Sequence, residues 1–424
     1  MIKKTLAVIL YFIGVFATAQ QRDVVNITLA KNDKPFNTDT ALILAIRVDT
    51  TLSQEFNVDT NKIVKDFNQQ DLEESGYKVW FMGSARINAH YDFAGMKSTE
   101  GFMPFDIPIG KQDVPGLSST YLGARQSRMG VGGDANTKVG KIKAYMEVDF
   151  ASASDSYLRL RHAYAEWNFV KLGYTWSTFM DNASLPKTVE FEGPNSSLSK
   201  RHGLIRYERI IKTRSILGIS LESPKADYYN PADTLLADVS THRNLDLASR
   251  YKYFDDWGHV QVAGILRRID VFSHGSMEVE YGWGVLFSST LHLGVKHQIN
   301  AQYSTGKGIA YYYVGFNGRQ LDAVYNPNTN SMMLKSIYGG FINYSFMHNP
   351  SLVYSLICGI SKMKVEAFEP ADTFLSSQYL GINVFYNPIK TISLGLEATT
   401  GTRKNFDNQQ GEATRISMMA KFDF

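Results

Sequence analysis

The sequence is poor in the features on which several protein classes depend. Cys358 is its single cysteine, so neither an intrachain disulfide nor a cluster of cysteine metal ligands can form, and we expect a buried structural thiol. Lys and Arg number 44 against 41 Asp and Glu, a balance that gives no support for a nucleic-acid-binding surface. Beyond the N-terminal segment no run of 18 or more apolar residues occurs, which excludes transmembrane helices.

The first residues have the pattern of an export signal. Lys3 and Lys4 precede the apolar run Leu6 to Phe16, which is too short to span a bilayer. Ala17-Thr18-Ala19 then fits a small-x-small cleavage site. We therefore predict a cleaved secretory signal peptide over residues 1–19; a short membrane anchor is the alternative.

Residues 20–75 differ from the rest of the chain in being rich in Asp, Asn, Gln and Thr. They predict a periplasmic N-terminal extension, with either a role in oligomerisation or that of a flexible linker. The remaining residues, 76–424, are predicted to form the membrane domain described next.

From Gly76 onward apolar and polar side chains alternate with a period of two. The pattern is clear in 77–92 and recurs in 141–150, 244–253 and 391–400. Successive side chains of a strand point to opposite faces, so each segment presents one apolar and one polar face. Aromatic residues make up 13% of the chain, as expected of a barrel with interfacial girdles. A large secreted all-β protein is the alternative on composition.

Sixteen such segments can be traced, from 77–93 to 412–424. An even number is typical of single-chain bacterial barrels. Short connectors fit periplasmic turns, whereas longer ones, such as 178–202 and 402–411, fit the outer side. The sequence thus predicts an all-β fold, a transmembrane antiparallel β-barrel of sixteen strands.

The C-terminal segment alternates between polar and apolar residues from Arg415 to the terminal Phe424. Such an ending resembles the assembly signal of bacterial outer-membrane barrels. The last strand must pair with the first, because an open edge is not tolerated in lipid. We therefore expect the protein in the outer membrane.

Several motifs resemble the DcaP-like family of outer-membrane porins. They lie between about residues 120 and 210 and comprise Gly123-Ala124-Arg125-Gln126-Ser127-Arg128, Glu147-Val148-Asp149-Phe150, Leu158-Arg159-Leu160-Arg161-His162-Ala163-Tyr164, Gly173-Tyr174-Thr175-Trp176-Ser177-Thr178-Phe179, Glu190-Phe191-Glu192-Gly193-Pro194 and Arg206-Tyr207. The resemblance implies a trimeric, sixteen-stranded channel whose basic constriction favours small anions such as dicarboxylates. Well-known members carry an N-terminal coiled coil, whereas residues 20–75 show no clear heptads.

The long polar connection after Thr178 is predicted to fold into the lumen as a constriction loop. Glu190 and Glu192 can anchor it to an arginine-lined wall by charge-assisted hydrogen bonds, and Arg201 lies at its end. Such anchoring would reduce the number of free positive charges along the path.

Arg159 and Arg161 share one face of their segment, and Leu160 lies on the other. An arginine on the lipid face near the midplane would cost about 2–4 kcal/mol, so we expect the arginines to face the lumen. Rings of Arg or Lys favour anions, and the guanidinium group binds carboxylates with two parallel hydrogen bonds. Further path candidates are Arg206, Arg125, Lys143, Arg86, Arg250 and Arg267. Alternatively, these side chains pair with carboxylates such as Glu147, Asp149, Glu208 and Asp246 and stiffen the wall.

The predicted function is passive diffusion of small, anionic solutes through a porin that is surrounded by outer-membrane lipid and assembled as a homotrimer. His162, His202 and His259 are isolated, so we predict no catalytic residues, metal ion, cofactor or nucleic-acid partner. The alternative from another class is a structural or adhesive barrel with a closed lumen.

Overall fold

A computed structural model describes residues 77–93, 96, 100–109, 118–151, 157–229, 239–241, 243–273 and 276–424. From Met82 onward the chain forms one compact unit. The predicted signal peptide (1–19) and periplasmic extension (20–75) lie outside the described residues and stay predictions. Among the described residues, no helix is both long and apolar enough to cross a membrane.

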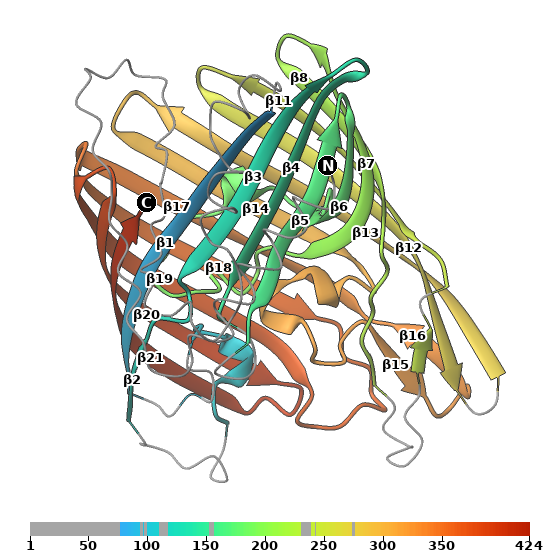
Figure 1. Ribbon diagram of the computed structural model, residues 1–424. Coiled ribbons are helices and arrows are strands. Elements are labelled where there is room, and N and C mark those ends of the chain that lie inside the picture. The colour runs from blue at the N-terminus through green and yellow to red at the C-terminus, as the bar shows by residue number, and fades with distance from the viewer. Residues whose placement is uncertain are drawn as a thin grey trace, which may run out of the picture. The chain divides into compact units, whose positions relative to one another are not determined.

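Sixteen antiparallel strands form a closed barrel, which confirms the predicted fold (Figure 1). Strand β1 pairs with β21 from Ser84 to Asp92, so the last strand closes on the first and no edge is left open to lipid. The barrel strands are β1 (Tyr77–Asp92), β3 (Arg128–Thr137), β4 (Gly140–Asp149), β5 (Arg159–Trp167), β6 (Val170–Trp176), β7 (Arg201–Lys212), β8 (Ser215–Glu222), β11 (Asp246–Asp255), β12 (Gly258–Ser273), β13 (Ser276–Leu293), β14 (His297–Lys307), β17 (Ser336–Asn349), β18 (Leu352–Met363), β19 (Phe374–Ile389), β20 (Ile392–Asn405) and β21 (Gln410–Asp423).

Shorter elements lie in the connections between barrel strands. Two short strands extend the barrel sheet, and three form a small separate sheet: β2 (Ser119–Gly123) and β10 (Val239–Thr241), then β9 (Tyr228–Tyr229), β15 (Ala323–Asn326) and β16 (Ser331–Leu334). Among the described residues there are four single-turn 3₁₀ helices: η2 (Pro104–Asp106), η3 (Asn182–Ser184), η4 (Ala310–Tyr312) and η5 (Val314–Phe316).

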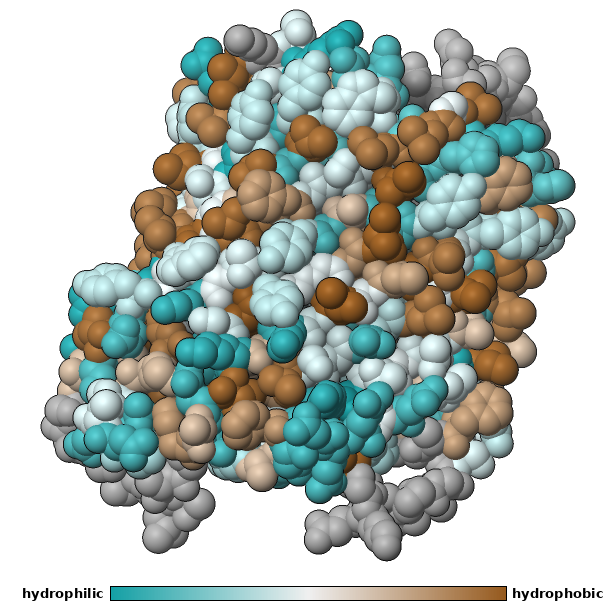
Figure 2. Space-filling model, turned by 180° about the vertical axis from the view of Figure 1, so that it is seen from behind, coloured by the Kyte–Doolittle hydropathy of each residue, from teal (hydrophilic) through white to brown (hydrophobic). Residues whose placement is uncertain are grey.

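The two faces of the barrel wall follow the period of two. In β18, Leu356 and Ile360 are exposed, whereas Ile357 and Ser361 are buried. Cys358 has the same parity as Leu356 and Ile360 and is exposed. The expectation of a buried thiol was therefore wrong, because this side chain lies on the outer, lipid-facing surface. Figure 2 shows how apolar side chains spread over one part of that surface.

Connections are short at one end of the barrel and mostly long at the other. The turn between β11 and β12 spans only two residues, whereas 28 residues separate Lys307 of β14 from Ser336 of β17. This asymmetry is typical of periplasmic turns and extracellular loops. The expected long loop 402–411 is wrong, because β20 continues to Asn405 and β21 begins at Gln410. Its polar residues extend the hairpin rather than ending it, since backbone pairing does not require apolar side chains.

A β-bulge in β5 changes which side chains enter the lumen. Glu147 pairs with His162 and Val148 pairs with Leu160, so Arg161 is the extra residue. Arg161 and His162 are consequently both buried. Strict alternation from Leu160 would place His162 on the lipid side, but the bulge shifts the parity of the strand by one residue and turns His162 inward.

Candidate permeation path

The constriction loop, residues 177–200, lies inside the barrel and is bonded to strands around it. Ser177 donates a hydrogen bond to Glu222 of β8 at 2.6 Å. Farther along the loop, Asn195 donates to Ser361 of β18 at 3.0 Å. All four side chains are buried, so the loop is fixed in the lumen by polar contacts that water does not weaken.

Asp181 is the hub of the first half of the constriction loop. Its carboxylate lies 2.7 Å from Lys252, 2.6 Å from His259 and 2.8 Å from the hydroxyl of Ser288. Burial alone would raise the pKa of Asp181, but the bond from His259 and the charge of Lys252 hold the pKa well below its usual range. Three neighbouring strands, β11, β12 and β13, are thus tied to one anionic loop residue.

Two glutamates fix the second half of the loop. Glu397 of β20 accepts hydrogen bonds from the backbone N–H groups of Val189 at 3.0 Å and Glu190 at 3.1 Å. The side chain of Glu190 accepts from the N–H groups of Phe102 at 3.1 Å and of Gly193. Burial, and then repulsion from Glu397, raise the pKa of Glu190 to about 8. The partners of Glu190 are therefore backbone N–H groups and the hydroxyl of Tyr379, which donates at 3.4 Å, rather than the arginine wall.

A second segment, residues 308–322, is held in the lumen by Arg267. Arg267 is only 2% exposed, and its guanidinium donates to Asp246 at 3.0 Å and to the carbonyl of Gly308. Tyr312 completes the network by donating to Asp246 at 3.0 Å. Arg267 lies on the lumen side, as its sequence position suggested. Its contacts, however, are structural: they hold residues 308–322 against the barrel wall.

Two more of the candidate arginines are occupied by neighbouring groups. Arg206 is buried, and it donates to the hydroxyl of Thr178 at 2.7 Å and to the carbonyl of Trp176. Arg250 forms an ion pair with Glu208. Arg206 therefore anchors the start of the constriction loop, whereas Arg250 links two strands of the wall.

The remaining three candidates are Arg86, Arg125 and Lys143. Arg86 donates to the carbonyl of Val189 at 2.5 Å, at the middle of the constriction loop. Arg125 is 3.8 Å from Glu100. Lys143 is exposed near the short turn between β3 and β4, at the end of the barrel opposite the long loops.

Arg159 and Arg161 belong to a set of five cations that we call the basic cluster: Arg128, Arg159, Arg161, Lys200 and Arg201. Arg159 binds Asp149 through two bonds of 2.9 and 2.7 Å. Arg161 bridges Glu147 and Asp149, each at 2.7 Å. The Arg159 and Arg128 side chains remain 34% and 38% exposed, so their outer edges face the aqueous lumen.

The last two members of the basic cluster lie at the end of the constriction loop. The guanidinium of Arg201 stacks on the ring of Trp176 at 3.8 Å, and no carboxylate in the described ranges lies within ion-pair distance of it. The ammonium of Lys200 lies 5.2 Å from the ring centre of Tyr311. Burial lowers the pKa of Lys200 to about 8, although the nearby Glu192 raises it.

Among the described residues, Glu147, Asp149 and Glu192 face the basic cluster, and Asp227, which also acts on Lys200, is balanced by Lys225. Three carboxylates against five cations leave a positive excess. Burial raises the pKa of Glu192, whereas the charges of Lys200 and Arg159 oppose that rise. The cluster thus presents a positive field to the lumen even though several of its members are ion-paired.

The model of the DcaP outer membrane protein family matches residues 42–424. The chain belongs to this family. Among solved structures, the DcaP channel of Acinetobacter baumannii is 22% identical, with a TM-score of 0.72 over 83% of this chain and 98% of that one. An anion-selective porin from Comamonas acidovorans is 12% identical, with a TM-score of 0.56 over 82% of this chain and 100% of that one. OmpF of Salmonella typhi, in complex with daunomycin, is 12% identical, with a TM-score of 0.51 over 83% and 99%. No curated protein matches the chain.

This DcaP-family protein is therefore an outer-membrane porin, as the motifs and the final strand predicted. Sequence reasoning did not include Lys200, Trp176 or Tyr311 among the candidate path residues. The dipeptide Lys200-Arg201 at the end of a long polar connection was the available signal, because it places two adjacent cations where the loop rejoins the wall.

Proposed function

We propose that this porin carries small anions across the outer membrane by passive diffusion, with carboxylates such as dicarboxylates as the preferred class. The observation that supports the proposal most directly is the positive excess of the basic cluster. Fixed positive groups in a narrow aqueous path attract anions, and their charge counts for more there than in bulk water. Guanidinium groups also match the two oxygens of a carboxylate.

Release of the solute is as important as its capture. Glu147 and Asp149 already occupy one side of Arg159 and Arg161. A passing carboxylate therefore competes with fixed carboxylates and does not meet bare cations. We expect weak binding at several neighbouring points, as passage through a channel requires.

The proposal is tested by single-channel conductance in planar bilayers, with the reversal potential measured under a KCl gradient. Stepwise openings with chloride preference are expected, and openings in groups of three would support the homotrimer that we also propose. Openings with cation preference would overturn anion selectivity. A correctly folded barrel that gives no openings would favour the structural or adhesive alternative with a closed lumen.

We predict that anion preference weakens as the pH rises from 7 to 9. Lys200 has a pKa of about 8, so it is mostly charged at pH 7 and mostly neutral at pH 9. Glu190, with a pKa of about 8, gains negative charge over the same interval and acts in the same direction. The reversal potential should therefore move toward zero on alkalinisation.

The variants Lys200→Gln and Glu190→Gln show which of the two groups causes this pH dependence. If Lys200 is the main titrating group, Lys200→Gln has a lower preference at pH 7 and a flatter profile, whereas Glu190→Gln keeps most of the pH dependence. A wild-type preference that is constant from pH 7 to 9 would contradict the role of Lys200.

A further inference from the structure

The outer surface of the barrel carries lysines where its apolar band ends toward the long loops. Ile342, Ile360 and Ile382 are exposed on β17, β18 and β19, as expected of side chains in contact with lipid. Tyr338 lies nearer the long-loop end of β17 and is also exposed, in the position of an interfacial aromatic residue. Figure 2 views the barrel from behind and shows hydrophilic side chains at both ends of the visible face, with more apolar side chains between them.

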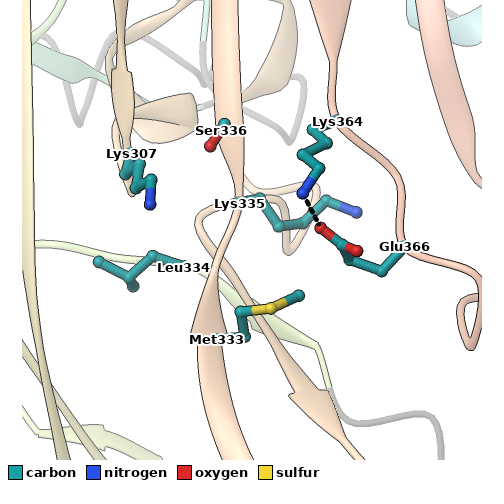
Figure 3. Close-up of a pocket in the computed structure, with 7 residues that line it drawn as sticks. All are labelled: Lys307, Met333, Leu334, Lys335, Ser336, Lys364 and Glu366. Carbon is teal, nitrogen blue, oxygen red and sulfur yellow. Dashed lines mark ion pairs between the residues drawn. The ribbon is translucent and has the colours of Figure 1, made fainter.

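Two of these lysines flank one serine across three neighbouring chain segments. Lys307 of β14 pairs in register with Ser336 of β17. On the other side, the backbone N–H of Lys364, directly after β18, donates to the carbonyl of Ser336 at 2.9 Å. Adjacent strands lie about 4.8 Å apart, so the Cα atoms of the two lysines are roughly 10 Å apart, and their long side chains can reach one phosphate. Figure 3 shows Lys307 and Lys364 on either side of Ser336.

The same arrangement recurs on the next strands. Lys362 of β18 pairs with Ser376 of β19, and Ser376 pairs with Lys404 of β20. Lys362 and Lys404 have the parity of the lipid-facing residues in their strands. We call the four side chains, Lys307, Lys362, Lys364 and Lys404, the lysine rim.

The lysine rim has little counter-charge within the protein. In the part of the chain that the structure describes, no carboxylate lies within ion-pair distance of Lys307, Lys362 or Lys404. Lys364 is 2.8 Å from Glu366 but is 67% exposed. Two further exposed carboxylates lie near the rim: Glu412 of β21 and Asp407 in the turn after β20. Positive charge therefore exceeds negative charge where the wall meets the headgroup region.

We propose that the lysine rim binds the phosphate groups of anionic lipids in the outer leaflet. Ammonium groups at the headgroup level attract lipid phosphates, and lysine stems can lie along apolar surface while their charged ends reach the interface. The pocket between Lys307 and Lys364 is also lined by Met333 and Leu334. Of these two, Leu334 is buried and Met333 is half-buried. An apolar side chain such as Met333 beside the ammonium groups fits a phosphate that is joined to acyl chains better than it fits a free ion.

The proposal can be tested by native mass spectrometry of the full-length protein in mild detergent, mixed with diphosphorylated lipid A or with phosphatidylcholine. Lys307→Gln/Lys364→Gln and Lys362→Gln/Lys404→Gln should each reduce the affinity for lipid A at least about tenfold, with no change for phosphatidylcholine. A matched control, Lys296→Gln/Lys390→Gln, removes the same charge from the short-turn end and should retain wild-type binding.

Heat-modifiable migration on gels verifies that each variant is a folded barrel. Because the lysine rim faces lipid rather than the lumen, ion selectivity should be unchanged in the rim variants. Unchanged lipid A retention in both rim variants, or an equal loss in the control, would overturn the proposal. Displacement of lipid A by millimolar inorganic phosphate would identify a free-phosphate site instead and would also overturn it.

Discussion

Replacement of both Arg159 and Arg161 by alanine is expected to abolish the preference for anions. The change removes two cations from the basic cluster and leaves Glu147 and Asp149 without their main partners. The remaining cations, Arg128, Lys200 and Arg201, then face three carboxylates, so the local positive excess disappears. The ratio of chloride to potassium permeability should fall to about one or below, measured from the reversal potential under a KCl gradient.

A matched variant separates charge from disturbed packing. Arg159→Ala/Arg161→Ala combined with Glu147→Gln/Asp149→Asn removes two charges of each sign and should recover anion preference relative to the arginine variant alone. If the arginine variant keeps wild-type selectivity while folded, the selectivity does not depend on these arginines, and our account of the path is wrong.

Replacement of Arg267 by alanine is expected to cause the largest loss of stability among single changes in the lumen. Asp246 would remain buried without its cation, and the carbonyl of Gly308 would lose a donor. Removal of one partner from a buried ion pair costs about 3–5 kcal/mol. The free energy of unfolding, measured by urea titration of the barrel in detergent, should fall by about this amount.

The partner variant provides the control for Arg267. Asp246→Asn added to Arg267→Ala removes the uncompensated charge and should restore part of the lost stability. If the free energy of unfolding of Arg267→Ala fell by less than about 1 kcal/mol, Arg267 would not have this structural role, because that value is typical of an exposed ion pair.

Much of the fold could be predicted because the barrel wall has lipid on one side and water on the other. Neighbouring residues such as Ile360, which faces lipid, and Ser361, which faces the lumen, therefore differ in polarity. This alternation allows a strand to be recognised in the sequence. The bulge at Arg161 could not be read in this way. It adds one residue to β5 without altering composition, and so it reverses the parity of His162 and every residue after it in the strand.

The path was harder to predict than the wall. Parity places Arg206 and Arg267 on the lumen side, but it does not show that one binds Thr178 and the other binds Asp246. These partners depend on how residues 177–200 and 308–322 pack inside the barrel. The sequences of these segments have no periodic pattern from which that packing could be predicted. Lys200 illustrates the same limit, since it lies in a loop and its surroundings depend on Tyr311, far along the chain.

The bonds from Val189 and Glu190 to Glu397 also constrain the order of assembly. They join residues more than 200 positions apart, and Glu397 belongs to the last hairpin of the barrel. Contacts of such long sequence separation form late, because the intervening chain must first be ordered. The second half of the constriction loop therefore gains these anchors only once β20 is in place, whereas the first half can already be bonded to β8, β11, β12 and β13.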